Sequence, residues 1–120
     1  MIPVHLLDSN GEVIVRISVA TAAIWDYSYL HNGGKFQYDS SMPDKPFPHE
    51  YNLGNHNLGI IDGWEVNIEN PLGKDTAYEV SVEWLQNGTI LNMTWAMSGQ
   101  VKAGEPADPK PGGSNKYVHP

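Results

Sequence analysis

The stretch from residue 76 to residue 99 constrains the fold most, because it has the pattern of a long β-hairpin. Apolar and polar residues alternate on both sides of Asn87-Gly88, as they do in half-buried strands. Asn-Gly is typical of a two-residue turn in which both central residues have positive φ. Such a turn predicts four apolar pairs on one face: Trp84 with Leu91, Val82 with Met93, Val80 with Trp95, and Tyr78 with Met97.

A second hairpin is predicted near the N-terminus, around Asn10-Gly11. A two-residue turn there puts the flanking apolar residues on one face and pairs Leu6 with Val15 and Val4 with Ile17. Residues 60–69 alternate in the same way and predict a further strand.

Residues 24–38 predict a third hairpin, closed by a turn at either Asn32-Gly33 or Gly33-Gly34. Both registers leave five aromatic residues on one face: Trp25, Tyr27, Tyr29, Phe36 and Tyr38. The sequence leaves two interpretations of this aromatic strip open. It is either part of the core or an exposed platform that stacks on sugar rings or binds a protein partner.

Together these stretches make about seven strands, and the sequence shows no amphipathic helix pattern. We therefore predict an all-β fold, an antiparallel β-sandwich of immunoglobulin-like or jelly-roll-like type. Residues 1–103 are predicted to form a single domain. Residues 104–120 are rich in proline and lack alternation, so they are predicted to be a flexible tail.

The composition excludes several classes of partner and site. The chain is acidic, with a formal net charge of −7, and Arg16 is its only arginine. Nucleic-acid binding needs clustered basic residues, so we expect no nucleic-acid partner. The chain has no cysteine, which excludes disulfides and thiolate chemistry. We see neither a signal peptide nor a transmembrane segment, and localisation stays open between the cytoplasm and a trimmed extracellular domain.

The longest break in the strand pattern runs from residue 40 to residue 59 and holds three closely spaced prolines, which predicts no regular strand there. Long loops in compact domains are often functional. We therefore place the candidate ligand-binding site here, at Tyr38, His49, Glu50, Tyr51, Asn52, Asn55 and His56. Such side chains hydrogen-bond sugar hydroxyls and stack on sugar rings. The alternative is a loop that crosses between the sheets and caps the core with Phe47 and Leu53.

The residue patterns that could indicate catalysis or metal binding in this sequence are incomplete. His49, Glu50 and His56 lack the His-Glu-x-x-His spacing of a helical zinc site. Three aspartates flank the same loop without forming a calcium-binding run: Asp39, Asp44 and Asp62. We expect no enzymatic activity, no metal and no cofactor.

Residues 64–105 resemble a known family. The resemblance lies in residues 64–73, 78–82, 87–88 and 101–105, which read as a strand with its turn, an alternating strand, a hairpin turn and an Ala-Gly-Glu before a last strand. This series is similar to the immunoglobulin-like modules of bacterial cell-surface proteins, of the CARDB type. The resemblance implies a non-catalytic sandwich and carries over no functional residue. It departs after Glu105, where the family has a closing strand and this chain is proline-rich.

Three functions are compatible with a small, acidic, non-enzymatic β-sandwich. The first is carbohydrate binding of a lectin-like kind. The second is a structural or interaction module of a bacterial or viral surface assembly, with a protein partner or a homo-oligomer. The third is a lipid-binding or toxin-like β protein. A sugar binder should expose aromatic rings near polar side chains, whereas an assembly module should bury an apolar patch against a partner.

Overall fold

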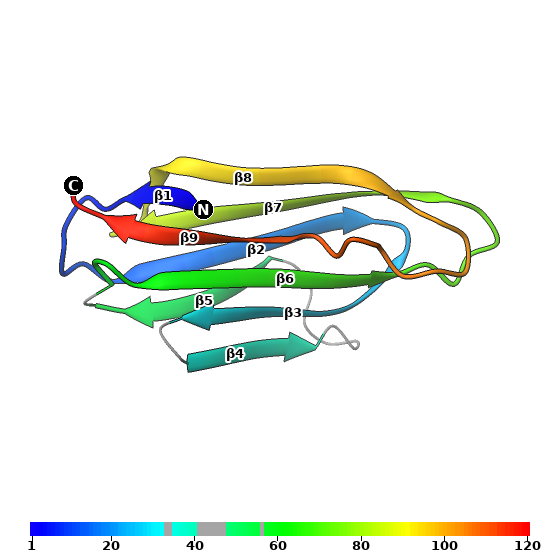
Figure 1. Ribbon diagram of the computed structural model, residues 1–120, viewed down its shortest axis with the longest axis horizontal. Coiled ribbons are helices and arrows are strands. Elements are labelled where there is room, and N and C mark those ends of the chain that lie inside the picture. Colours follow the sequence, from blue (N-terminus) through cyan, green and yellow to red (C-terminus); the bar gives the residue numbers. More distant parts are fainter. Residues whose placement is uncertain (33–34, 41–47, 56) are drawn as a thin grey trace.

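The computed structural model describes the backbone of residues 1–32, 35–40, 48–55 and 57–120, and in these ranges all side chains except those of residues 24–27, 35–40 and 92–93. This part of the chain forms nine strands and no helix, in two sheets packed face to face (Figure 1). The predicted β-sandwich is confirmed. Within the same ranges, no helix has the length and apolar character needed to cross a membrane.

Sheet A has five strands, which in spatial order are β1 (Ile2–His5), β9 (Gly112–Val118), β6 (Ile61–Glu69), β3 (Ile24–Asn32) and β4 (Lys35–Ser40). Sheet B has four, which in spatial order are β5 (His49–Gly54), β2 (Val13–Thr21), β7 (Thr76–Gln86) and β8 (Thr89–Val101). All neighbours are antiparallel except β1 and β9, which are parallel. Among the nine described strands, only β3–β4 and β7–β8 follow each other within one sheet, and each other pair of consecutive strands lies in different sheets.

The core lies between the inner faces of the two sheets. The apolar faces predicted for residues 60–69 and 76–86 are both buried there. Trp64 of sheet A is at its centre and packs edge-to-face against two tryptophans of sheet B, with ring centroids 5.2 Å from Trp84 and 5.7 Å from Trp95. Such edge-to-face contacts add stabilisation beyond the burial of apolar area.

The β7–β8 hairpin has the predicted turn, with φ of 53° at Asn87 and 75° at Gly88. Three of the four predicted pairs are wrong, and the fourth, Trp84 with Leu91, lies at the register shift with both side chains buried. The register shifts after Leu85, so that Val82 pairs with Trp95 and Val80 with Met97. The shift is two residues, which keeps the alternation of faces and leaves the apolar residues facing inward.

The predicted hairpin around Asn10-Gly11 is wrong, because β1 and β2 lie in different sheets. The four residues paired in that prediction are nevertheless buried, because the two segments face the same core from opposite sheets. They are Val4, Leu6, Val15 and Ile17. The buried Gln86 side chain holds the crossing segment. Its Oε1 accepts hydrogen bonds from the amides of Leu7 (2.6 Å) and Asp8 (2.9 Å), and its Nε2 donates to the Asp8 carbonyl (2.6 Å).

In the β3–β4 hairpin, Asn32 pairs with Lys35. Of the two predicted turns, this register is compatible with the one at residues 33–34. Ser28 and Leu30 of β3 are buried, and Tyr29 between them is half-buried. The register of β3 against β6 shifts between Trp25 and Tyr27, so the predicted alternation is interrupted there. The other four residues of the aromatic strip lie outside the described side chains.

Residues 49–54 form strand β5, so the prediction of an irregular loop without a strand is wrong for this part. β5 pairs with β2 at the edge of sheet B. All three prolines of the 40–59 segment precede its first residue, and a proline before a strand does not interrupt hydrogen bonds within it. Residues 41–47 and 56 of the predicted loop, which include the proposed core plug Phe47, lie outside the described residues.

The prediction of a flexible tail is also wrong for residues 112–118, because they form β9 between β1 and β6. Asn115 and Tyr117 are fully buried. The preceding residues also follow β6, where the amide of Ala107 donates to the Ile68 carbonyl (2.8 Å) and the Val66 amide donates to the Pro111 carbonyl (2.9 Å). Residues 112–118 are therefore part of the β-sandwich.

Candidate functional site

Four of the seven predicted ligand-binding residues lie on β5 and point to opposite sides of it. His49 and Tyr51 are buried, with 3% and 2% of their surface exposed, whereas Glu50 and Asn52 are exposed. Side chains alternate along a strand, so these four residues cannot line one surface.

His49 and Tyr51 belong to a buried network between the sheets. The hydroxyl of Ser28 on β3 lies 2.8 Å from Nδ1 of His49 and 2.6 Å from the hydroxyl of Tyr51, which also donates to the Ser28 carbonyl (3.2 Å). A Ser–His contact is also a component of nucleophilic active sites. Here all three side chains are buried, so we assign the network a structural role in joining sheet A to sheet B.

The exposed members of the predicted site make local contacts. Glu50 Oε2 accepts from Arg16 Nη2 at 3.5 Å, and exposed ion pairs of this kind stabilise little. Asn52 Oδ1 accepts from the amide of Gly54 (2.8 Å) in a local turn. Asn55 is exposed.

Two members remain. Tyr38 pairs with Tyr29 in the β4–β3 register, but its side chain lies outside the described part, as does all of His56. The described residues thus do not bring the predicted site together on one surface.

Metal binding was predicted to be absent, with the three aspartates and the His49 region as the alternatives. Among the side chains that the structure describes, no group of three or more His, Asp or Glu residues is placed to hold a metal ion. Asp39 and Asp44 lie outside the described side chains, and Asp62 is buried in sheet A.

Asp62 forms the centre of a buried polar cluster that the sequence analysis missed. The Tyr117 hydroxyl donates to its carboxylate, and its register partners are Asn115 on β9 and Asn32 on β3. Burial raises the pKa of Asp62 from 3.8 to about 7, although the hydrogen bond from Tyr117 acts in the opposite direction. Burial, with the nearby Asp62 charge, also raises the pKa of Tyr117. The sequence does indicate that Asp62 is buried, because it lies two residues from the buried Trp64 and so faces the same side of β6.

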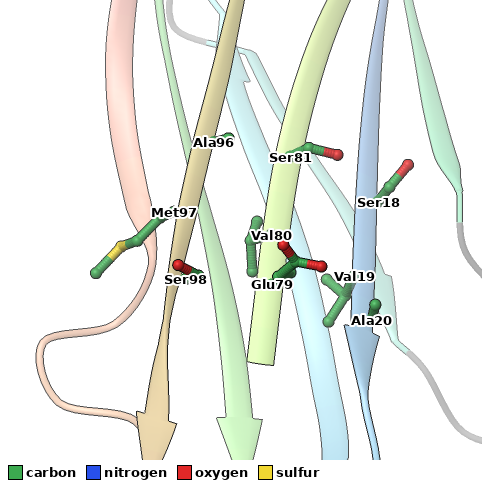
Figure 2. A pocket seen from close by; sticks show the side chains of 9 residues that line it. All are labelled: Ser18, Val19, Ala20, Glu79, Val80, Ser81, Ala96, Met97 and Ser98. Atoms are coloured by element: carbon green, nitrogen blue, oxygen red, sulfur yellow. The ribbon is translucent and has the colours of Figure 1, made fainter. Parts of the chain in front are cut away.

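The outer face of sheet B carries a shallow hollow of about 350 Å³, which we call the outer-face hollow. It crosses the middle of three neighbouring strands, β2, β7 and β8, and nine residues line it: Ser18, Val19, Ala20, Glu79, Val80, Ser81, Ala96, Met97 and Ser98. Figure 2 shows the Glu79 carboxylate among them, between the strands that carry Ser98 and Ala20.

The strand register explains the shape of the outer-face hollow. One row across the strands is Ser18, Ser81 and Ala96, and the next outward-facing row is Ala20, Glu79 and Ser98. All but Glu79 have small side chains, which leaves space above the sheet. Three strands span about 10 Å and the two rows lie about 7 Å apart, the size of one or two sugar rings.

The sequence analysis named none of the residues that line the outer-face hollow as a candidate ligand-binding residue. Small outward-facing residues can be seen in the sequence of each of the three strands. Only the strand order and register, however, place them side by side.

The fold and this surface define a class, a β-sandwich domain with a polar hollow on one outer face. Comparison with family models, with curated proteins and with solved structures finds no match to this chain.

Proposed function

We propose that this protein is a non-enzymatic carbohydrate-binding module whose ligand lies in the outer-face hollow. The observation that carries the proposal is the set of polar groups around a floor of small side chains. Three serine hydroxyls and one carboxylate share a surface with two alanines: Ser18, Ser81, Ser98, Glu79, Ala20 and Ala96.

The chemistry of these groups suits a neutral polyhydroxylated ligand. A carboxylate accepts hydrogen bonds from sugar hydroxyls, and serine hydroxyls both donate and accept. The alanine methyl groups offer apolar contact to the C–H groups of a sugar ring. The hollow contains no basic residue and the chain has a net charge of −7, so an anionic ligand is disfavoured.

The nine lining residues include no aromatic ring, so sugar stacking does not contribute within the outer-face hollow. We therefore expect a weak single site, with a dissociation constant on the order of 1 mM. Multivalent display of the glycan and of the protein raises the apparent affinity into a measurable range.

A glycan array probed with the multivalently displayed protein tests the proposal. The Glu79→Gln variant should lose binding, because the amide is a poorer acceptor for sugar hydroxyls. Glu83→Gln is the matched control, since Glu83 lies on the same face of β7 but outside the hollow. The control should bind as the unmodified protein does. Equal binding by the Glu79 variant, or no glycan bound by the unmodified protein, would overturn the proposal.

A structural or interaction module is the second candidate, and exposed apolar side chains at one end of the sandwich favour it. Leu7 follows β1, Ile61 begins β6 and Ile90 lies at the start of β8, and each is about half exposed. These three elements meet at the same end of the molecule (Figure 1). This candidate predicts association with a protein partner in the absence of any sugar. Sugar-independent binding that Leu7→Ser abolishes would support it, and a protein that associates with nothing would exclude it.

A further inference from the structure

Strand β8 lies at an edge of sheet B and lacks the features that protect the other edges. Its 13 residues include no charged residue and no proline. In contrast, β1 is four residues long and contains Pro3, β4 contains Lys35 and Asp39, and β5 contains Glu50. Short length, charge and proline are the usual means by which edge strands avoid pairing with other chains. By these criteria β8 is open to the addition of another strand.

The free part of this edge is long enough to pair. β1 lies beside the first part of β8 (Figure 1), and residues 94–100 continue beyond it in regular pairing with β7. No strand of the described chain pairs with the other side of β8. The N–H and C=O groups on that side therefore offer hydrogen bonds to an added strand.

The inner face of the same edge leaves apolar surface partly uncovered. Trp95 and Met97 are only half-buried, whereas their β7 partners Val82 and Val80 are almost completely buried. A strand added beside β8 would cover the side of Trp95 and Met97 that β7 does not cover. The edge thus offers both backbone hydrogen bonds and an apolar contact.

We propose that two copies of this chain pair through β8, antiparallel about a twofold axis near Ala96, to form a continuous eight-stranded sheet. Antiparallel pairing of identical strands has the self-complementary symmetry of isologous dimers. With the axis at Ala96, Trp95 of each copy lies opposite Met97 of the other, a favourable sulfur–aromatic pair. Thr94 then lies opposite Ser98, a pair of hydroxyl side chains that can hydrogen-bond across the strands.

Charge favours a second copy over a basic partner segment, although each chain carries a net charge of −7. β8 itself is neutral, and the carboxylates of Glu79 and Glu83 are one strand away on β7. In the dimer, the β7 strands of the two copies are three strand spacings apart, about 14 Å, which exceeds the Debye length of about 8 Å. An uncharged edge therefore does not repel a second copy of itself. It also offers no carboxylate with which a cationic segment could pair.

Sedimentation equilibrium over a concentration series tests the dimer. The unmodified protein should dimerise, and Ala96→Lys should be monomeric because two lysines then face each other. Ala77→Lys is the matched control, since Ala77 is also an exposed alanine in sheet B, on the internal strand β7, and the change in net charge is the same. It should dimerise normally. Ala96→Glu alone should also be monomeric, and mixing it with Ala96→Lys should restore a dimer.

A cysteine substitution locates the axis, because the chain has no cysteine of its own. Directly opposed residues in an antiparallel pair have Cα atoms within disulfide range. Ala96→Cys should therefore form a covalent dimer on mild oxidation, and Ala77→Cys should not. A monomer at all concentrations would overturn the proposal. So would a dimer that persists in Ala96→Lys and is not linked by Ala96→Cys.

Discussion

The indole ring of Trp64 on β6 lies directly over Gly113 on β9, its register partner. A Cβ atom at residue 113 would be 2.8 Å from Cζ2 of that ring. Trp64 has little room to move, because it is 2% exposed and packs against Trp84 and Trp95. The glycine-containing start of β9 is therefore fitted to the centre of the core.

This contact predicts that Gly113→Ala destabilises the protein by about 1–3 kcal/mol, because the added methyl group overpacks the core. Gly73→Ala is the control, since a Cβ atom there meets nothing within 4 Å. Its effect should be within about 0.5 kcal/mol. Urea unfolding of both variants measures the difference, and equal free energies of unfolding would contradict the assigned contact.

Deletion of residues 104–120 should abolish the native fold, because it removes a strand from the interior of sheet A together with the buried Tyr117. We expect a loss above about 3 kcal/mol, a large part of the stability of a typical domain. Circular dichroism during thermal unfolding measures this loss. A truncated protein that unfolds cooperatively at the original temperature would show that β9 is dispensable.

The sequence predicted those parts of the fold that depend on local chemistry. Turn residues and period-2 alternation were enough to predict the Asn87-Gly88 turn, the inward faces of β6 and β7, and the sandwich class. Alternation tells which side of a strand is buried, but not which strand is its neighbour. This is why Val4 and Ile17 were correctly expected to be buried but wrongly paired with each other.

The wrong predictions concern strands that have a weak sequence pattern or whose neighbouring strands are distant in the sequence. β9 has few apolar residues, and its burial depends on β1 and β6 on either side. β5 did alternate, with His49 and Tyr51 against Glu50 and Asn52, but the nearby prolines concealed the pattern. The outer-face hollow depends on the register of three strands, which no local pattern specifies.

Tyr51 should contribute to stability through its hydroxyl, which bonds to Ser28 in the core. We expect Tyr51→Phe to cost about 1–3 kcal/mol, because it leaves buried polar atoms of Ser28 with fewer partners. Asn55→Ala, at an exposed position, should change the free energy of unfolding by less than about 0.5 kcal/mol. Denaturant unfolding distinguishes the two, and an unchanged stability of Tyr51→Phe would argue against the buried network.

The raised pKa of Asp62 predicts a stability that falls with rising pH. The folded protein keeps this proton up to pH 7, whereas the unfolded chain releases it near 3.8. The contribution is therefore fully present below pH 3.8 and is lost as the pH rises through 7. Asp62→Asn should remove this slope, so that the difference in unfolding free energy between variant and unmodified protein grows across that range. A difference that is constant with pH would contradict the assignment.

A two-dimensional ¹H–¹⁵N NMR titration with an array-selected glycan tests whether carbohydrate binds in the outer-face hollow. Binding there should produce concentration-dependent shifts of the amide signals of Ser18, Ser81 and Ser98. The amide signals of Glu50 and Asn52, which are exposed on β5 outside the hollow, should not shift. Shifts confined to β5 and the loop that follows it, with the serine amide signals unchanged, would contradict binding in the hollow.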